Sequence, residues 1–292
     1  MMHKMEPWLK KMMLGVYGFV PLKCELFSMI RFFYLPKESI FRHLYFKGNF
    51  KVSVDKEHSF LMKHYGSGFA MESDHFWKGV GACERYSIDL WIKYAKQSDL
   101  ILDIGANTGT YSLIASALNS NAEVHAFEPV KRTFDKLQSN VQINTFDIHL
   151  HNIALSDTVG EIFLMEEGGS NEYTAHVTKL QNPNSYLVCC KRLDSILNVN
   201  YIGKNILMKL DVERHEVSVL LGMGDLLKQL RPIILLEVLD EEMAIQLNPF
   251  FENLEYVFYN IDEMKGYFEI SSVQKSFGNN IFCCPKEKVL QS

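Results

Sequence analysis

Two carboxylates that end successive apolar runs are the residues of this chain with the most readable chemistry. Asp103 follows the run LIL, and Glu128 follows EVHAF, 25 residues further along. If both runs are parallel strands, they end at one edge of a sheet, which is where α/β sheets bind ligands. One carboxylate there can receive an ammonium group, and the other can accept both hydroxyls of a ribose. The pair therefore predicts a ligand with an amino-acid end and a nucleoside end.

The glycines after Asp103 narrow the choice of ligand. Gly105 and Gly109 form the pattern G-x-x-x-G, whereas a dinucleotide fingerprint reads G-x-G-x-x-G and sets a helix amino terminus against a pyrophosphate. An acid two residues before the first glycine would repel that pyrophosphate. We therefore predict S-adenosylmethionine rather than a nicotinamide cofactor. The residues expected to bind it are Asp103, Gly105, Ala106, Asn107, Gly109, Glu128 and Pro129.

A polar cluster in the segment MKLDVERHE is where we expect a methyl acceptor to meet the cofactor. Charged side chains are rarely buried without a partner, so Lys209 either serves a site or pairs with Asp211 or Glu237. If the methyl acceptor is a hydroxyl, it is a poor nucleophile and is helped by a base within hydrogen-bond reach. We expect Asp211 to be that base, and His215, which titrates near neutrality, is the alternative. Lys209, Asp211 and His215 are thus the candidate catalytic residues.

Three carboxylates in this region leave a second chemistry open. Asp211, Glu213 and Glu237 could hold a divalent cation that lowers the pKa of an acceptor hydroxyl. They come from two separate runs and do not by themselves make a cation cage. We therefore assign no metal to the site.

The order of apolar runs supplies the elements that would position these residues. From Glu84 onward, the runs alternate with helical periodicities, which predicts βαβ units, a parallel sheet and helices on both of its faces. The runs are LILDIG, EVHAFE, IHLHNIAL, NILMKLDV and PIILLEVL, with a hairpin of GEIFLMEE and SYLVCC before the fourth. YVFYNID and NNIFCC, with a turn at Gly266 between them, predict an antiparallel closing pair. The predicted fold is α/β and Rossmann-like, with a mostly parallel seven-stranded sheet.

These segments, in this order, resemble the FkbM family of methyltransferases. The resemblance covers roughly residues 84–237 and rests on DIGANTGTYSL, AFEP, NIALSD, LDSIL, MKLDVERHEVSVLLG and RPIILLE. It implies the class I methyltransferase fold, S-adenosylmethionine as cofactor, and transfer to a hydroxyl oxygen of a sugar, glycan or secondary metabolite. By position, Ala154 and Ser156 would approach the adenine. Glu84 resembles an acid that many members place before the first strand.

One position departs from the family pattern. The family motif reads D-V-E-G-x-E, and here Arg214 stands in place of the glycine, after Glu213. Glycine permits close packing or an unusual backbone angle, so this arginine bears on the local geometry. Arginine also matches carboxylate and phosphate groups with two parallel hydrogen bonds. We expect Glu213 and Arg214 on the acceptor side, with Arg214 docking an anionic group; a solvated arginine is the plainer interpretation.

Two other functions stay open at this stage. Nitrogen methyltransferases resemble one another in an N/D-P-P-Y/F element after the fourth strand, and this chain has LDVE there. The loss of the family glycine would alternatively fit a catalytically impaired subunit that binds S-adenosylmethionine and assists a partner. Neither the oligomeric state nor the acceptor can be read from the sequence.

Charge and cysteine content bear on partners and location. The formal net charge of −5 and the absence of a basic stripe disfavour nucleic acid as a partner. The 6 cysteines lack the spacing of a zinc site, so we expect free thiols in buried strands and a cytoplasmic protein.

The first 83 residues look like an addition to the methyltransferase domain. Residues 1–47 have helical patterning, and residues 50–80 hold two strand-like runs broken by glycines. The apolar stretch MMLGVYGFVPL is cut short by Pro21 and Lys23, so we expect packed helices rather than a signal peptide or peripheral membrane contact. The predicted division is an extension at 1–83, serving as a cap or substrate-side segment, and a methyltransferase domain at 84–292.

Overall fold

A large mixed sheet forms the centre of the protein. The computed structural model describes residues 22–66, 70–81, 84–166, 175–178, 185–197 and 199–290. The strands of the main sheet are β3 (Leu100–Ile104), β4 (Glu123–Phe127), β5 (Ile148–His151), β10 (Ile206–Leu210), β11 (Ile233–Glu237), β12 (Tyr256–Asp262), β13 (Gly266–Ile270) and β14 (Asn280–Pro285). They lie in the order β13-β12-β14-β11-β10-β3-β4-β5. The strands from β11 to β5 are parallel, and β14, β12 and β13 continue the sheet by antiparallel pairing.

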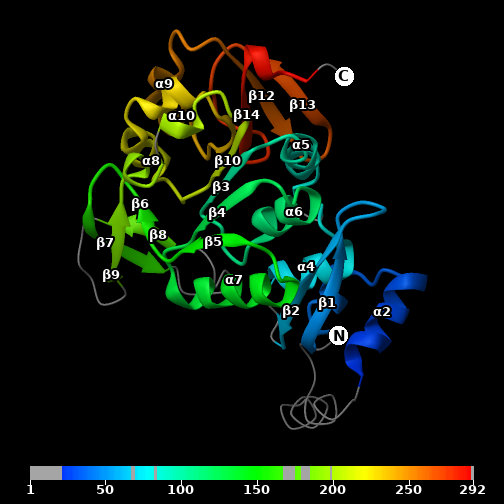
Figure 1. Cartoon of the computed structure of the whole chain (residues 1–292). Helices are drawn as coiled ribbons and strands as arrows, with labels where there is room; N and C mark the ends of the chain where they lie inside the picture. The colour runs from blue at the N-terminus through cyan, green and yellow to red at the C-terminus, as the bar shows by residue number, and fades with distance from the viewer. Residues whose placement is uncertain are drawn as a thin grey trace.

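Helices cover both faces of this sheet, as the apolar strands predicted (Figure 1). The helices α5 (Arg85–Ala95), α6 (Thr110–Leu118) and α7 (Lys131–Asn144) share one hydrophobic core, and α8 (Glu216–Met223), α9 (Leu226–Leu230) and α10 (Glu241–Leu247) share the other. Successive strand residues point to opposite faces. Leu100 and Leu102 of β3 accordingly join the second core, while Ile101 joins the first. The α/β class and its layers are confirmed.

The strand count differs from the prediction. The main sheet has eight strands rather than seven, because the segment after the turn at Asp262 runs back along β12 as the edge strand β13. The run IHLHNIAL is also not one strand. It is divided between β5 in the main sheet and β6 (Ala154–Leu155), which pairs with a different sheet. Periodicity alone could not separate two short strands joined by two residues.

A small second sheet follows β5 in the chain. It consists of β6, β7 (Gly160–Glu166), β8 (Ala175–Thr178) and β9 (Ser185–Lys191), and the predicted hairpin is the antiparallel pair β7–β9. The short 3-10 turns η2 (Leu193–Ser195) and η3 (Val199–Tyr201) lead back to the main sheet. Two further turns, η4 (Asn248–Phe251) and η5 (Lys286–Lys288), follow α10 and β14.

The part of the chain before residue 84 adds helices and a hairpin. Its elements are α2 (Lys23–Phe33), α3 (Glu38–Phe41), the antiparallel pair β1 (Lys47–Ser53) and β2 (Ser59–Tyr65), and α4 (Ala70–Lys78). Figure 1 shows the hairpin beside α4, and β2 also contacts α7. Phe50 and Trp77 belong to the same buried core as Trp91 of α5. The division of the chain at residue 83 stays a prediction.

The structure tests two predictions only in part: packed helices in the N-terminal apolar stretch, and free thiols in buried strands. The stretch MMLGVYGFVPL lies almost wholly outside the described residues, and so does Cys83. In the described part of the chain the five cysteines are free; Cys190, Cys283 and Cys284 are buried, but Cys189 is exposed, which the expectation of buried thiols missed. None of the described helices combines the length and the apolar character that crossing a membrane requires.

Candidate active site

A cavity of about 330 Å³ lies at the carboxyl edge of the parallel strands. It sits where the chain order reverses, because β3 has β4 on one side and β10 on the other, and such switch points are ligand sites in α/β sheets. We call it the switch-point cavity. Of the candidate residues, those that line it are Glu84, Gly105, Ala106, Asn107, Glu128, Pro129, Ala154, Lys209, Asp211, Glu213 and His215. The candidates that do not line it are Asp103, Gly109, Ser156 and Arg214.

Gly105 joins the two chemical motifs of the sequence. A Cβ atom on Gly105 would lie 1.7 Å from the carbonyl oxygen of Asp211, and the residue has φ +83°. Only glycine takes this conformation without strain while allowing such a close approach. The loop after β3 therefore packs directly on the end of β10, and this contact fixes Asp211 relative to the loop.

Gly105→Ala is expected to lower the free energy of unfolding by about 2–4 kcal/mol, from left-handed strain plus forced displacement of the Asp211 backbone. Gly203→Ala is the matched control, because Gly203 has φ +82° but nothing lies within 4 Å of an added Cβ. It should lose only the strain, about 1–2 kcal/mol. Urea denaturation measures both values, and equal losses in the two variants would contradict the packing role of Gly105.

Asp103 stands just behind the cavity wall. Its side chain is 1% exposed, and its Oδ2 atom accepts hydrogen bonds from the backbone N–H, at 2.9 Å, and the hydroxyl of Ser112. The Oδ1 atom is buried and has no hydrogen-bond partner among the described residues. Burial raises the pKa of this carboxyl above its ordinary value. A buried acceptor without a donor is costly unless a ligand supplies one.

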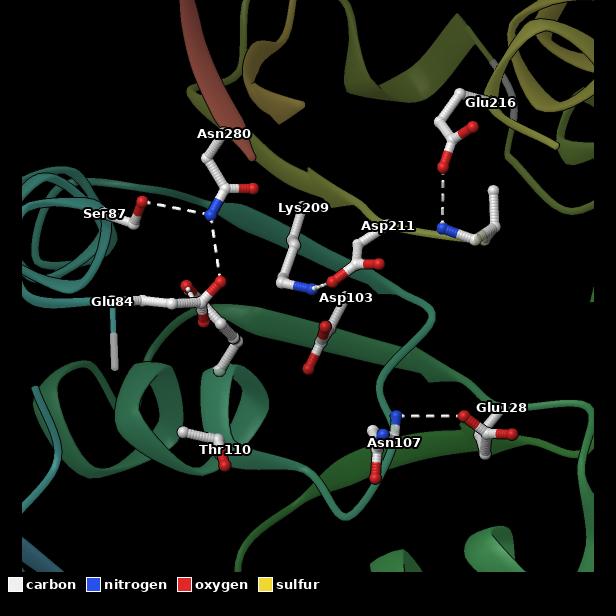
Figure 2. A network of polar contacts seen from close by, with 12 residues as sticks. Glu84, Ser87, Asp103, Asn107, Thr110, Glu128, Lys209, Asp211, Glu216 and Asn280 are labelled. Carbon is white, nitrogen blue, oxygen red and sulfur yellow. Dashed lines mark hydrogen bonds and ion pairs between the residues drawn. The ribbon is translucent and has the colours of Figure 1, made fainter. Parts of the chain in front are cut away.

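Glu128 occupies the corresponding position after β4. Its Oε2 atom accepts the backbone N–H of Asn107 at 3.0 Å (Figure 2), and its Oε1 atom accepts that of Val130 at 2.8 Å. Burial raises the pKa of Glu128 to about 7. Each carboxylate oxygen has a further lone pair, so both can still accept a hydrogen bond from a ligand hydroxyl.

Lys209 and Asp211 form the ion pair that the sequence offered as one alternative. Lys209 Nζ lies 2.5 Å from Asp211 Oδ2 and 4.8 Å from the ring centre of Tyr111. Burial alone would lower the pKa of Lys209, but the carboxylates around it, Asp211 first, raise it above its usual range. Lys209 thus stays charged and holds the Asp211 carboxylate at the cavity.

Glu84 is tied to the same group of residues. Its Oε2 atom accepts the hydroxyl of Tyr111 at 2.9 Å, and its Oε1 atom accepts the Asn280 amide at 2.9 Å (Figure 2). The same amide donates to the hydroxyl of Ser87 at 3.1 Å. Glu84 therefore links the helix α5 to the end of β14 and faces the cavity from the side opposite Glu128 on the sheet.

His215 and Ser156 are engaged with each other. His215 Nε2 lies 2.9 Å from Ser156 Oγ, which also donates to Asp157 Oδ1 at 3.0 Å. Burial lowers the pKa of His215, so the ring is neutral at physiological pH. Ala154 lines the cavity, whereas the Ser156 side chain is turned to His215.

The backbone conformation at Arg214 explains why the family pattern has a glycine at this position. Glu213 and Arg214 have φ +53° and +75°, so the turn between β10 and α8 needs two consecutive left-handed residues. Glycine takes that conformation without strain, and arginine takes it at a cost of about 1–2 kcal/mol. The Arg214 guanidinium is 62% exposed and pairs with Asp240, the amino-terminal cap of α10. The arginine thus lies on the rim, outside the cavity wall.

Carboxyl groups outnumber cations around Asp211. Burial and then the charge of Asp211 raise the pKa of Glu237 to about 10, and burial raises that of Glu216 to about 7. Both have a buried Oε2 atom with no partner in the described part of the chain. Such a site favours a cationic ligand. Within the same residues, the oxygens of Asp211, Glu213 and Glu237 do not all come within 4.8 Å of one another, as the ligands of one ion would.

The residues that close the cavity on the other side were not predicted from the sequence. Met71 and His75 of α4 line it together with Tyr111 of α6. His75 Nε2 lies 2.8 Å from Thr110 Oγ1, and burial lowers the pKa of His75 to about 4. The glycines that interrupt residues 66–81 hid this helix, and Tyr111 read as an ordinary helix residue next to the DIGANTG segment.

Comparison with known proteins places the site in context. Residues 103–267 match the family described as Methyltransferase FkbM domain. The hexuronic acid methyltransferase AglP of Haloferax volcanii is 30% identical over 151 residues, which cover 52% of this chain and 61% of that protein. The AMB antimetabolite synthetase AmbE of Pseudomonas aeruginosa is 26% identical, over 56% of this chain and 9% of that protein. The chain thus spans less than two thirds of either relative.

A crystal structure of a methyltransferase FkbM from Methylobacillus flagellatus aligns with 49% of this chain and 33% of its own, at a TM-score of 0.36 and 16% identity.

Proposed function

Because the chain belongs to the FkbM family of methyltransferases, whose cofactor is S-adenosylmethionine, we propose that it moves the methyl group of this cofactor to an oxygen atom. The acceptor is a hydroxyl of a sugar, a glycan or another small metabolite. One observation supports the proposal most strongly. The acid-rich switch-point cavity brings Glu128, Asn107 and Asp211 together from three neighbouring strands and their loops.

The residues present fit this cofactor. When bound, it supplies an electrophilic methyl group on a positively charged sulfur. The buried Oδ1 atoms of Asp103 and Asn107 lack partners in the described chain and suit the ammonium end. Glu128 has lone pairs left for two ribose hydroxyls. The surplus of carboxyl groups near Asp211 suits a cation.

Asp211 is the base in this proposal. It lines the cavity at the carboxyl end of β10, and its Oδ2 atom is held by Lys209. The other oxygen of the carboxylate can take the proton of an acceptor hydroxyl as the new carbon–oxygen bond forms. A positioned base contributes about 10²–10⁴-fold to such a step. His215 is the weaker candidate, because its Nε2 atom is already bonded to Ser156.

The acceptor in this proposal carries an acidic group. The relative from Haloferax volcanii is named for hexuronic acids, which are sugars with a carboxylate. Arg214 stands on the rim of the cavity beside Glu213, which lines it. Its guanidinium can bind the acceptor's carboxylate in two parallel hydrogen bonds after exchanging Asp240 for it.

Two variants of this rim should act in opposite directions. Arg214→Gly is expected to raise KM for an anionic acceptor about tenfold, because a charge-assisted pair is lost, with cofactor affinity unchanged. Asp240→Asn should lower KM, since it removes the competing carboxylate and an asparagine still caps α10. Steady-state kinetics with matched acidic and neutral sugars measure both. If both variants have the KM of the wild type, Arg214 does not bind the carboxylate of the acceptor.

The function itself is tested with methyl-labelled cofactor. The purified chain is incubated with a uronic acid, its nucleotide-linked form, the matching neutral sugar and an amino sugar. Label in an alkali-stable ether of the acidic sugars is the expected result. Label on nitrogen would favour the N-methyltransferase alternative, and a methyl ester would leave Asp211 without a base role. Cofactor binding with no transfer to any of them would support the impaired-subunit alternative.

A further inference from the structure

A second cluster of metal-ligand side chains lies away from the switch-point cavity. Glu123 and His125 are on β4, and His149 is on β5 directly opposite His125 in the strand register. Residues two apart on a strand share a face, so Glu123 lies on the same face as His125. One ligand atom from each of the three side chains lies within 4.8 Å of the other two. The methyl-transfer chemistry proposed above uses none of them.

Hydrogen bonds hold two of these ligands in place. Glu123 Oε1 accepts the hydroxyl of Tyr201 at 2.9 Å and lies 2.9 Å from His125 Nε2. The other ring nitrogen of His125, Nδ1, lies 3.1 Å from His151 Nε2. His125 is 8% exposed, and its ring lies 4.7 Å from that of His149, centre to centre. Two imidazoles and a carboxylate therefore converge with their orientations already set.

This is the donor set that a borderline metal ion prefers. Two imidazole nitrogens and a carboxylate oxygen, with a remaining position for water, suit Zn²⁺ and its neighbours in the first transition series. A ligating histidine commonly passes its other ring proton to an outer partner, which fixes the tautomer. His151 stands in that place. In the ion-free protein the Nε2 proton of His125 can be donated to Glu123; with an ion on Nε2, the ring proton would be on Nδ1 and donated to His151.

The cluster is also reachable. A hollow of about 420 Å³ borders Glu123 and His149, and Asp147 and Asn119 line it as well. It lies by the amino ends of β4 and β5, whereas the switch-point cavity lies at their carboxyl ends. We propose that Glu123, His125 and His149 form a binding site for a divalent transition-metal ion of the Zn²⁺ type, separate from the methyl-transfer site. Such an ion joins β4 to β5, the edge strand of the main sheet.

Calorimetric titration of the full chain with Zn²⁺ tests this site. The wild type is expected to bind one ion per chain at the cluster, with a rise in Tm because the ion binds the folded form. His149→Ala should weaken the binding at least about 10-fold, the smallest loss seen even for outer partners of metal ligands. His149 is exposed, so this variant is not expected to unfold the protein. Co²⁺ in place of Zn²⁺ adds visible absorption bands that report nitrogen and oxygen ligation.

Two further variants make the result specific. His43→Ala removes another exposed histidine, one that does not belong to the cluster, and should leave Zn²⁺ affinity unchanged. Glu123→Gln keeps an acceptor for Tyr201 but removes the charge, and should weaken the binding as His149→Ala does. Absence of binding by the wild type would overturn the proposal. Wild-type affinity in either cluster variant, or an equal loss in His43→Ala, would overturn it too.

Discussion

Asp211→Asn is expected to lower the rate of methyl transfer by about 10²–10⁴-fold while leaving the fold and the affinity for S-adenosylmethionine unchanged. Asparagine keeps the shape and one oxygen for Lys209 but cannot take a proton from the acceptor. Cofactor affinity is measured by calorimetry, the rate by transfer of a labelled methyl group, and the fold by thermal denaturation. His215→Gln is the comparison variant and should lose far less activity.

Two results would contradict this role for Asp211. If the variant melts early even with cofactor present, the Lys209–Asp211 pair serves stability, because Lys209 would be left buried without its partner. If EDTA abolishes wild-type activity and a divalent ion restores it, Asp211 acts as an ion ligand instead. Activity that survives the chelator, together with an inactive and stable Asp211→Asn, is the expected pair of results. EDTA also removes any ion at the Glu123 cluster, so Glu123→Gln is assayed in parallel.

Asp103→Ala and Glu128→Ala should each weaken cofactor binding by about 1.5–3 kcal/mol, which is about 10- to 150-fold, because each removes an acceptor of charge-assisted hydrogen bonds. Both side chains are nearly fully buried, at 1% and 6% exposed, so Asp103→Asn and Glu128→Gln accompany them as variants that keep the volume. Glu161→Ala removes an exposed carboxylate that does not line the cavity and should have no effect. Unaltered affinity in both alanine variants would refute the site.

The raised pKa of Glu128 gives this binding a pH dependence. Burial raises the pKa from its ordinary value of 4.5 to about 7 in the cofactor-free protein. Ribose hydroxyls donate to the ionised form, so affinity should rise as the pH increases through 7 and level off above it. The free protein behaves in the opposite way: folded Glu128 holds a proton that the unfolded chain releases, so its contribution to stability falls between pH 4.5 and 7. Glu128→Gln should remove this share of both effects.

The sequence was most informative at positions where the local structure allows few residue types. Asp103, Gly105 and Glu128 are set by a strand end and a left-handed turn, and the structure places the loop and both carboxylates at the carboxyl edge of the sheet. Continuous apolar runs likewise identified the buried parallel strands. The cofactor, S-adenosylmethionine, follows from membership of the family. The roles of the individual residues in binding it stay predictions.

The parts that the sequence could not supply depend on contacts between distant segments. Met71 and His75 reach the cavity only because α4 packs against Thr108 and Thr110, an arrangement with no periodic signature. Tyr111 becomes part of the site because the ammonium group of Lys209, almost a hundred residues later in the sequence, lies over its ring. The eighth strand was missed because Gly266 marks a turn equally well whether or not a strand follows. Position 214, by contrast, could be interpreted from the sequence. The family pattern has a glycine there, and a glycine in a conserved turn motif indicates an unusual backbone angle.

The surplus of carboxyl groups behind Asp211 has a consequence for turnover. Glu237, whose pKa burial and the charge of Asp211 raise to about 10, holds a proton at neutral pH even with the charge of Lys209 acting on it. If the cavity holds a sulfonium, its positive charge would lower that pKa, whereas a neutral thioether would not. The acid-rich surroundings of Asp211 would then favour the charged cofactor over its demethylated product.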